Sequence, residues 1–105
     1  MADRRRVSTY RDALARTAPG RVVCELGVGH VPLGLMALQL GAERVYAVDS
    51  DPEALALSLR SVQEHGFTAE QYITVCGHPG SIQLPERVDV IASEPLSSLG
   101  FCEDT

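Results

Sequence analysis

The residues best placed for chemistry are two glycines and a carboxylate that follow two apolar runs of the chain. Gly27 and Gly29 follow the run RVVCEL, and Asp49 follows the run VYAV. Glycines let the backbone turn tightly and approach a ligand, and a carboxylate after the next strand can accept both hydrogen bonds of a ribose diol. Together these residues favour a nucleoside-bearing ligand over an ordinary turn between a strand and a helix.

A nicotinamide dinucleotide is a weaker candidate for that ligand. The dinucleotide fingerprint GxGxxG would require a glycine at position 32, where this chain has Pro32. A purely structural role for Asp49 at a helix N-terminus is also weaker, because Asp51 already serves that purpose. The glycines and Asp49 therefore indicate a nucleoside ligand of another class.

Hydrophobic periodicity and the positions of glycine and proline predict the elements that hold these residues. Two helices and a short N-terminal helix are expected at Leu33–Leu40, Asp51–His65 and Ser8–Arg16. Four strands are expected at Arg21–Leu26, Val45–Val48, Tyr72–Cys76 and Val88–Ala92. The apolar residues in these strands are continuous rather than alternating. This pattern predicts an α/β fold with a Rossmann-like, doubly wound parallel sheet, covered on both faces and truncated after about four strands.

The outer edge of the last predicted strand has no obvious partner in the sequence. The strand Val88–Ala92 is apolar on both faces, and no further strand is expected among the residues that follow it. A long apolar edge is a template for pairing with another chain. We therefore expect self-association through this edge.

Length, composition and charge limit the classes to which the protein can belong. The chain has 105 residues, a formal net charge of −5 and 45% hydrophobic residues. These values indicate one domain, with residues 1–20 as an N-terminal helical segment and residues 21–105 as the core. The acidic balance disfavours nucleic-acid partners, and no apolar run is long enough for a membrane span. Three cysteines without a CxxC pair indicate reduced thiols and no metal site. We expect a soluble protein of the cytoplasm, with the nucleus as the alternative.

The motifs in their order resemble a known enzyme family. The segment VVCELGVGHVPLGLMALQLGAERVYAVDSD looks like motif I and post-I of class I S-adenosylmethionine-dependent methyltransferases. With SEPL after the last strand and RVSTYRDAL near the start, the chain is most similar to the protein arginine methyltransferases. The resemblance runs from Arg6 to at least Leu96 and corresponds to about the first half of that family's catalytic core.

This resemblance implies S-adenosylmethionine as the cofactor and assigns residues to it. Arg6 would meet the cofactor's carboxylate, and Asp49 would hold its ribose. Glu25, Gly27 and Gly29 would line the methionine end.

The resemblance also implies an acidic pair that binds an arginine side chain of a protein substrate. Glu94 would be the first glutamate of the pair, and Glu103, nine residues later, would be the second. A guanidinium stays protonated at neutral pH, and two carboxylates can orient it and localise its charge. Proximity to the methyl donor would then supply most of the acceleration.

Departures from the family pattern leave two functions open. Val31 replaces the third glycine of motif I, and Gly80 replaces a glutamate that would contact the adenine. The first function is a protein arginine N-methyltransferase, present as a fragment or a truncated form. The second is a non-catalytic Rossmann-like module that binds a cofactor or a partner. Methylation of nucleic-acid amino groups is disfavoured, because the loop Ser93–Leu96 has no aromatic residue to stack a flipped base.

Overall fold

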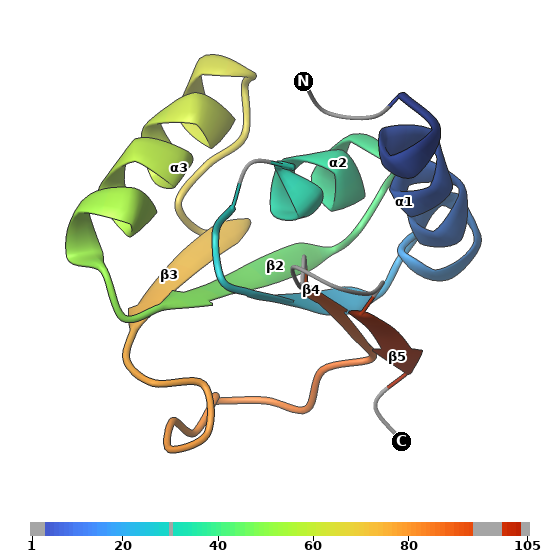
Figure 1. Cartoon of the computed structure of the whole chain (residues 1–105). Coiled ribbons are helices and arrows are strands. Elements are labelled where there is room, and N and C mark those ends of the chain that lie inside the picture. The colour runs from blue at the N-terminus through green and yellow to red at the C-terminus, as the bar shows by residue number, and fades with distance from the viewer. Residues whose placement is uncertain (1–3, 30, 94–99, 104–105) are drawn as a thin grey trace.

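The computed structural model describes residues 4–29, 31–93 and 100–103. Within these residues, three helices alternate with the first three strands, and two further strands follow (Figure 1). The elements are α1 (Arg4–Thr17), β1 (Val22–Leu26), α2 (Leu33–Gln39), β2 (Arg44–Asp49), α3 (Pro52–Glu64), β3 (Tyr72–Cys76), β4 (Val90–Ser93) and β5 (Gly100–Glu103).

The sheet has the strand order β3-β2-β1-β4-β5. β1 lies between β2 and β4 and pairs with both in parallel, and β2 pairs in parallel with β3. The chain therefore builds the sheet outward from β1 in both directions, and the order reverses between β1 and β4. Open α/β sheets bind ligands at the carboxyl ends of the strands beside such a reversal. The predicted Rossmann-like α/β fold is confirmed.

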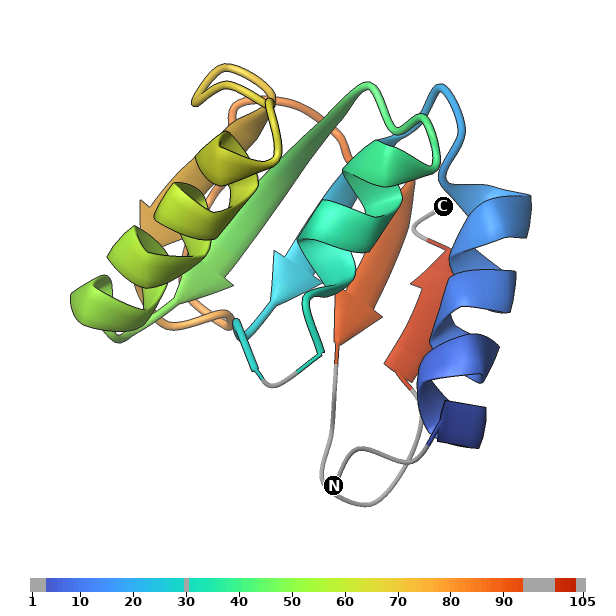
Figure 2. The same cartoon turned by 90° about the horizontal axis from the view of Figure 1, so that it is seen from above.

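The three described helices lie on the same face of the sheet. Figure 2 shows α3, α2 and α1 side by side above the strands, and Figure 1 shows the link between β3 and β4 below them. Residues 77–89 of that link contain no helix, since Pro79, Gly80 and Pro85 interrupt it. Ile82 and Leu84 of the link instead pack against the second face of the sheet. The sheet is thus covered on both faces, but helices cover only one of them within the described residues.

The prediction that the fourth strand has a free edge is wrong. β5 pairs antiparallel with β4, with Ile91 opposite Cys102 and Ser93 opposite Gly100. Self-association through an exposed β4 edge is therefore also wrong, because the chain itself supplies the missing partner strand. The four residues of β5 carry too little periodicity to be recognised from the sequence, and only long-range pairing reveals them.

Local signals explain the start of α3 but not that of α1. α3 begins where predicted, because the Asp51 side chain accepts the backbone N–H of Glu53 at 3.0 Å and Pro52 occupies the first turn. α1 begins at Arg4, four residues earlier than expected. None of the helices in the described part of the chain is long and apolar enough to cross a membrane.

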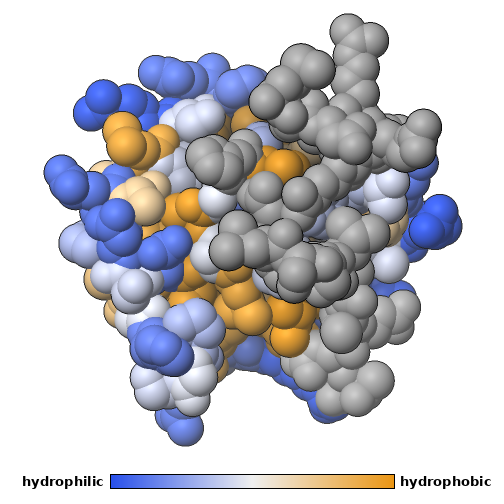
Figure 3. Space-filling view, in the orientation of Figure 1, coloured by the Kyte–Doolittle hydropathy of each residue, from blue (hydrophilic) through white to orange (hydrophobic). Residues whose placement is uncertain are grey.

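Alternation along the central strand separates two hydrophobic clusters. Val23 belongs to the larger cluster beneath the helices, whereas Cys24 belongs to the smaller cluster above the link. On the face shown in Figure 3, hydrophobic residues lie near the centre, and hydrophilic residues lie on the left and lower sides. Glu25 is the exception, since it is a charged residue within the buried strand β1.

Candidate functional site

The glycine loop and Asp49 are joined at the carboxyl ends of β1 and β2. Gly27 has a φ of +80°, which glycine adopts without strain, and its N–H donates to the carbonyl of Val48 at 2.7 Å. The N–H of Val28 donates to Oδ2 of Asp49 at 2.9 Å, and the N–H of Asp51 donates to Oδ1 at 2.9 Å. These bonds orient the carboxylate, and each of its oxygens keeps a further lone pair for a ligand.

The loop also has room for a ligand. A Cβ added to Gly27 would meet no described heavy atom within 4 Å apart from its chain neighbours. The open space, the accessible backbone and the remaining acceptor capacity of Asp49 fit a nucleoside with a free diol. The predicted grouping of Gly27, Gly29 and Asp49 at one edge of the sheet is thus present in the structure.

Glu25 lies in a hydrogen-bonded chain that crosses three elements. Its side chain is buried, with 2% of the residue exposed, and the Tyr72 hydroxyl donates to its Oε1 at 2.7 Å. The Tyr72 oxygen lies 2.5 Å from the Ser58 hydroxyl of α3. Burial raises the pKa of Glu25 to about 7, although hydrogen bonds from Tyr72 and from the backbone of Gly34 and Leu33 oppose that rise.

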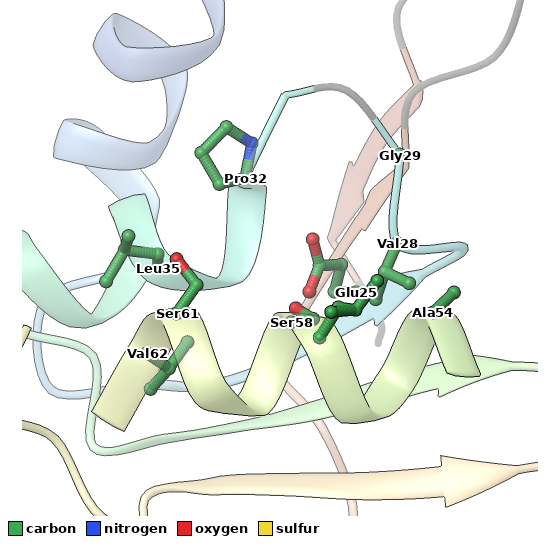
Figure 4. Close-up of a pocket in the computed structure, with 10 residues that line it drawn as sticks. Glu25, Val28, Gly29, Pro32, Leu35, Ala54, Ser58, Ser61 and Val62 are labelled. Atoms are coloured by element: carbon green, nitrogen blue, oxygen red, sulfur yellow. The ribbon is translucent and has the colours of Figure 1, made fainter. Parts of the chain in front are cut away.

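The Glu25 carboxyl points into a cavity of about 250 Å³ between the glycine loop, α2 and α3 (Figure 4). Val28 and Gly29 line it from the loop, and Ser58 and Ser61 line it from α3. Val28 therefore contacts both features: it lines the cavity, and its N–H donates to the Asp49 carboxylate. A carboxyl group in such a cavity suits a cationic group of a ligand.

A glycine in α2 makes this arrangement sterically feasible. A Cβ on Gly34 would lie 2.6 Å from Oε1 of Glu25 and 2.7 Å from Cε1 of Tyr72. Sequence reasoning did not single out Gly34, Tyr72 or Ser58. The available signal was the glutamate itself, because a carboxyl group in an apolar strand needs buried partners.

The remaining predicted residues are not brought together by the described structure. Arg6 belongs to α1, and its side chain is outside what the structure describes. Glu94 follows β4 in the sequence and lies outside the described residues. The backbone of Glu103 pairs with Val90, at the opposite end of β4 from Ser93.

A second polar cluster lies at the amino end of β2 and fastens the link below the sheet. Arg44 donates from Nη2 to Oε1 of Glu86 at 2.8 Å and also bonds Oε2 through Nε, and Tyr46 donates to Oε2 at 2.5 Å. These donors lower the pKa of Glu86 to about 2. Since every oxygen of Glu86 is engaged and the cluster is far along the strand from the glycine loop, we assign it a structural role.

Comparison with known proteins identifies the fold and the family. The family model of ribosomal protein L11 methyltransferase (PrmA) matches residues 11–98. The histone-arginine methyltransferase CARMER of Anopheles gambiae is 36% identical over 98% of this chain, but the chain covers only 17% of that protein.

Solved structures agree with this assignment. The PRMT1 enzyme–prozyme heterotetramer of Trypanosoma brucei with AdoHcy is 33% identical and has a TM-score of 0.73, over 85% of this chain and 28% of the other. Protein arginine methyltransferase 10 of Arabidopsis thaliana is 30% identical and has a TM-score of 0.76, over 88% of this chain and 27% of the other. The matched methyltransferase family model and the solved relative with AdoHcy together show that the chain belongs to the S-adenosylmethionine-dependent methyltransferases.

Proposed function

We propose that the chain binds S-adenosylmethionine at the carboxyl ends of β1 and β2 and serves protein arginine N-methylation. The observation that carries the cofactor proposal is the bond between Asp49 and the N–H of Val28. It holds the glycine loop and the ribose-binding carboxylate in one rigid unit, as a nucleoside site requires.

Each residue of this unit has a distinct role in the proposal. Asp49 accepts the ribose hydroxyls with its remaining lone pairs, and the glycine loop lets the ligand approach the backbone. Glu25 faces the cationic methionine end. Arg6, on the evidence of the family resemblance, binds the cofactor's carboxylate. When bound, the cofactor supplies a methyl group on a positively charged sulfur.

Calorimetry with S-adenosylhomocysteine and with NAD tests the cofactor proposal. We expect S-adenosylhomocysteine to bind more tightly than NAD, and Asp49→Ala to weaken it by roughly 10- to 100-fold, the loss of hydrogen bonds to a charged group. Asp89→Ala is the matched control, because Asp89 also accepts a backbone N–H, from Val22 at 2.9 Å, but at the amino end of β1. Tighter NAD binding, or equal losses in both variants, would contradict the proposal.

The arginine specificity is supported by the relatives, which are arginine methyltransferases by name. We assign the binding of the substrate guanidinium to Glu94. Glu94→Gln keeps the shape of the side chain and removes its charge. It should abolish methyl transfer to an arginine peptide while leaving S-adenosylhomocysteine binding nearly unchanged, in this chain or in any longer active chain that contains it. An active Glu94→Gln variant would refute the arginine assignment.

Glu103 is the second acid of the proposed pair, and it requires a separate test. Strand β5 places the backbone of Glu103 beside Val90, at the opposite end of β4 from Ser93. Loss of methyl transfer in Glu103→Gln, with cofactor binding kept, would show that Glu103 reaches the substrate. Retained transfer would show that the Glu103 carboxylate is not needed for the reaction. If cofactor binds but no chain containing this domain methylates arginine, the non-catalytic alternative replaces the enzyme.

A further inference from the structure

Tyr72 and Ser58 form an ordered relay that ends on the Glu25 carboxyl. Tyr72 has one hydroxyl proton and donates it to Oε1 of Glu25 at 2.7 Å. The 2.5 Å contact with Ser58 must then use the Ser58 proton, which is donated to the Tyr72 oxygen. The donor order therefore runs from α3 through β3 to β1 and stabilises a negative charge on Glu25.

The packing around this relay leaves Glu25 little freedom to turn away. Tyr72 is 1% exposed, and the backbone of Gly34 is close enough to both side chains that an added Cβ would clash with each. Ser58 lines the cavity into which the Glu25 carboxyl points, as Figure 4 shows. The relay thus joins one wall of the cavity to the acid inside it.

We propose that Tyr72 and Ser58 are positioning residues, which hold the Glu25 carboxyl in the cavity in a form that binds the cationic end of the cofactor. The proposal rests on the proposed cofactor site and adds to it the two residues that prepare Glu25. Both act through Glu25 and not on the cofactor's reacting atoms.

Several groups act on the ionisation of Glu25 from the surrounding elements. Tyr72 donates from β3, α2 contributes backbone hydrogen bonds from Leu33 and Gly34, and Asp49 of β2 acts as a like charge that disfavours ionisation. Burial is the largest influence and keeps the pKa near 7. Removing the Tyr72 donor removes a stabilising bond from the ionised form, so it raises this pKa further.

The first test measures the affinity for S-adenosylhomocysteine by calorimetry from about pH 5.5 to about pH 8.5. Because an ionised Glu25 attracts the ligand's ammonium group, affinity should increase as the pH rises through the Glu25 transition. Tyr72→Phe should move the midpoint of this increase upward by about one pH unit, the effect of losing a hydrogen bond to a charge. Ser58→Ala should move it in the same direction by less, and Glu25→Gln should abolish it.

Tyr46→Phe is the matched control. Tyr46 is also a buried strand tyrosine whose hydroxyl donates to a carboxylate. Its partner is Glu86, in the polar cluster at the amino end of β2 and away from the glycine loop. Its profile should coincide with that of the unmodified chain, even if its melting temperature falls as much as that of Tyr72→Phe. A midpoint shift in both variants would show that the effect of Tyr72→Phe comes from a general loss of stability and not from its bond to Glu25.

The second test needs no ligand and separates this proposal from the cofactor proposal. In the free chain with ¹³C-labelled glutamate, the carboxyl resonance of Glu25, assigned by its loss in Glu25→Gln, reports its ionisation directly. Its midpoint should also move upward in Tyr72→Phe and stay in place in Tyr46→Phe. If the chain binds no S-adenosylhomocysteine at all, the proposed function fails while this measurement still decides the relay. An unchanged Glu25 midpoint in Tyr72→Phe overturns the positioning role.

Discussion

Replacement of Glu25 by glutamine should remove most of the pH dependence of stability near neutrality. Glu25 has a pKa of about 7 in the folded chain against an ordinary value of 4.5, chiefly because burial disfavours its charge. Between these values the folded state binds a proton that the unfolded state releases. Stability is therefore highest below about pH 4.5 for this group, falls as the pH rises, and levels off above about pH 7.

The size of this effect follows from the difference of about 2.5 pH units between the two pKa values. At 1.36 kcal/mol for each unit, the free energy of unfolding should fall by about 3 kcal/mol across the window. Glu86 does not interfere, since its lowered pKa of about 2 acts on stability only at more acidic pH. Such a loss is a large part of the stability of a small domain.

Urea unfolding at about pH 5 and about pH 8 measures this difference, and the midpoint of the unmodified chain should fall by roughly 2 M. Glu25→Gln should show nearly the same midpoint at both pH values. Glu64→Gln, which changes an exposed glutamate of α3, is the control and should retain the full dependence. If the unmodified chain and Glu25→Gln lose the same stability with pH, Glu25 is not the group responsible, and burial does not disfavour its charge by the expected amount.

Two further predictions concern packing and the polar cluster below the sheet. Gly34→Ala should destabilise the fold by about 2 kcal/mol, as measured by urea unfolding, because the added Cβ would overlap Glu25 and Tyr72. An unchanged urea midpoint would contradict this, since it would mean that both side chains can move aside without loss of stability. The ionised Glu86 stabilises the fold above about pH 4.5, and this stabilisation is lost as the pH falls toward 2. Glu86→Gln should therefore lower the melting temperature at pH 7 and reduce the loss of stability on acidification. Circular dichroism melts at pH 7 and at about pH 3 would show this, and equal melts of the variant and the unmodified chain at both would contradict it.

Local sequence patterns were sufficient to predict the helix and strands that lie close to the candidate site. The cap at Asp51 and the apolar runs before Gly27 and Asp49 depend on a few neighbouring residues, and the structure has a helix and two parallel strands at these places. Strand β5 and the side of the sheet that the link covers depend on pairing between distant segments. A four-residue strand and a link interrupted by prolines show too little hydrophobic periodicity for such pairing to be predicted from the sequence.

The sequence by itself determined the α/β class and the grouping of Gly27, Gly29 and Asp49, because parallel strands that each end in a loop must bring those loops to one edge. The family resemblance assigned Glu25 to the methionine end of the cofactor, but the buried partners that a carboxyl group in an apolar strand requires were not predicted. Only the tertiary structure decided that the side-chain partner is Tyr72, which in turn bonds Ser58. Residues 25, 58 and 72 meet because α3 packs over β2 and β3 and because Gly34 lets the side chains approach. That contact is a property of packed surfaces, which no local spacing encodes.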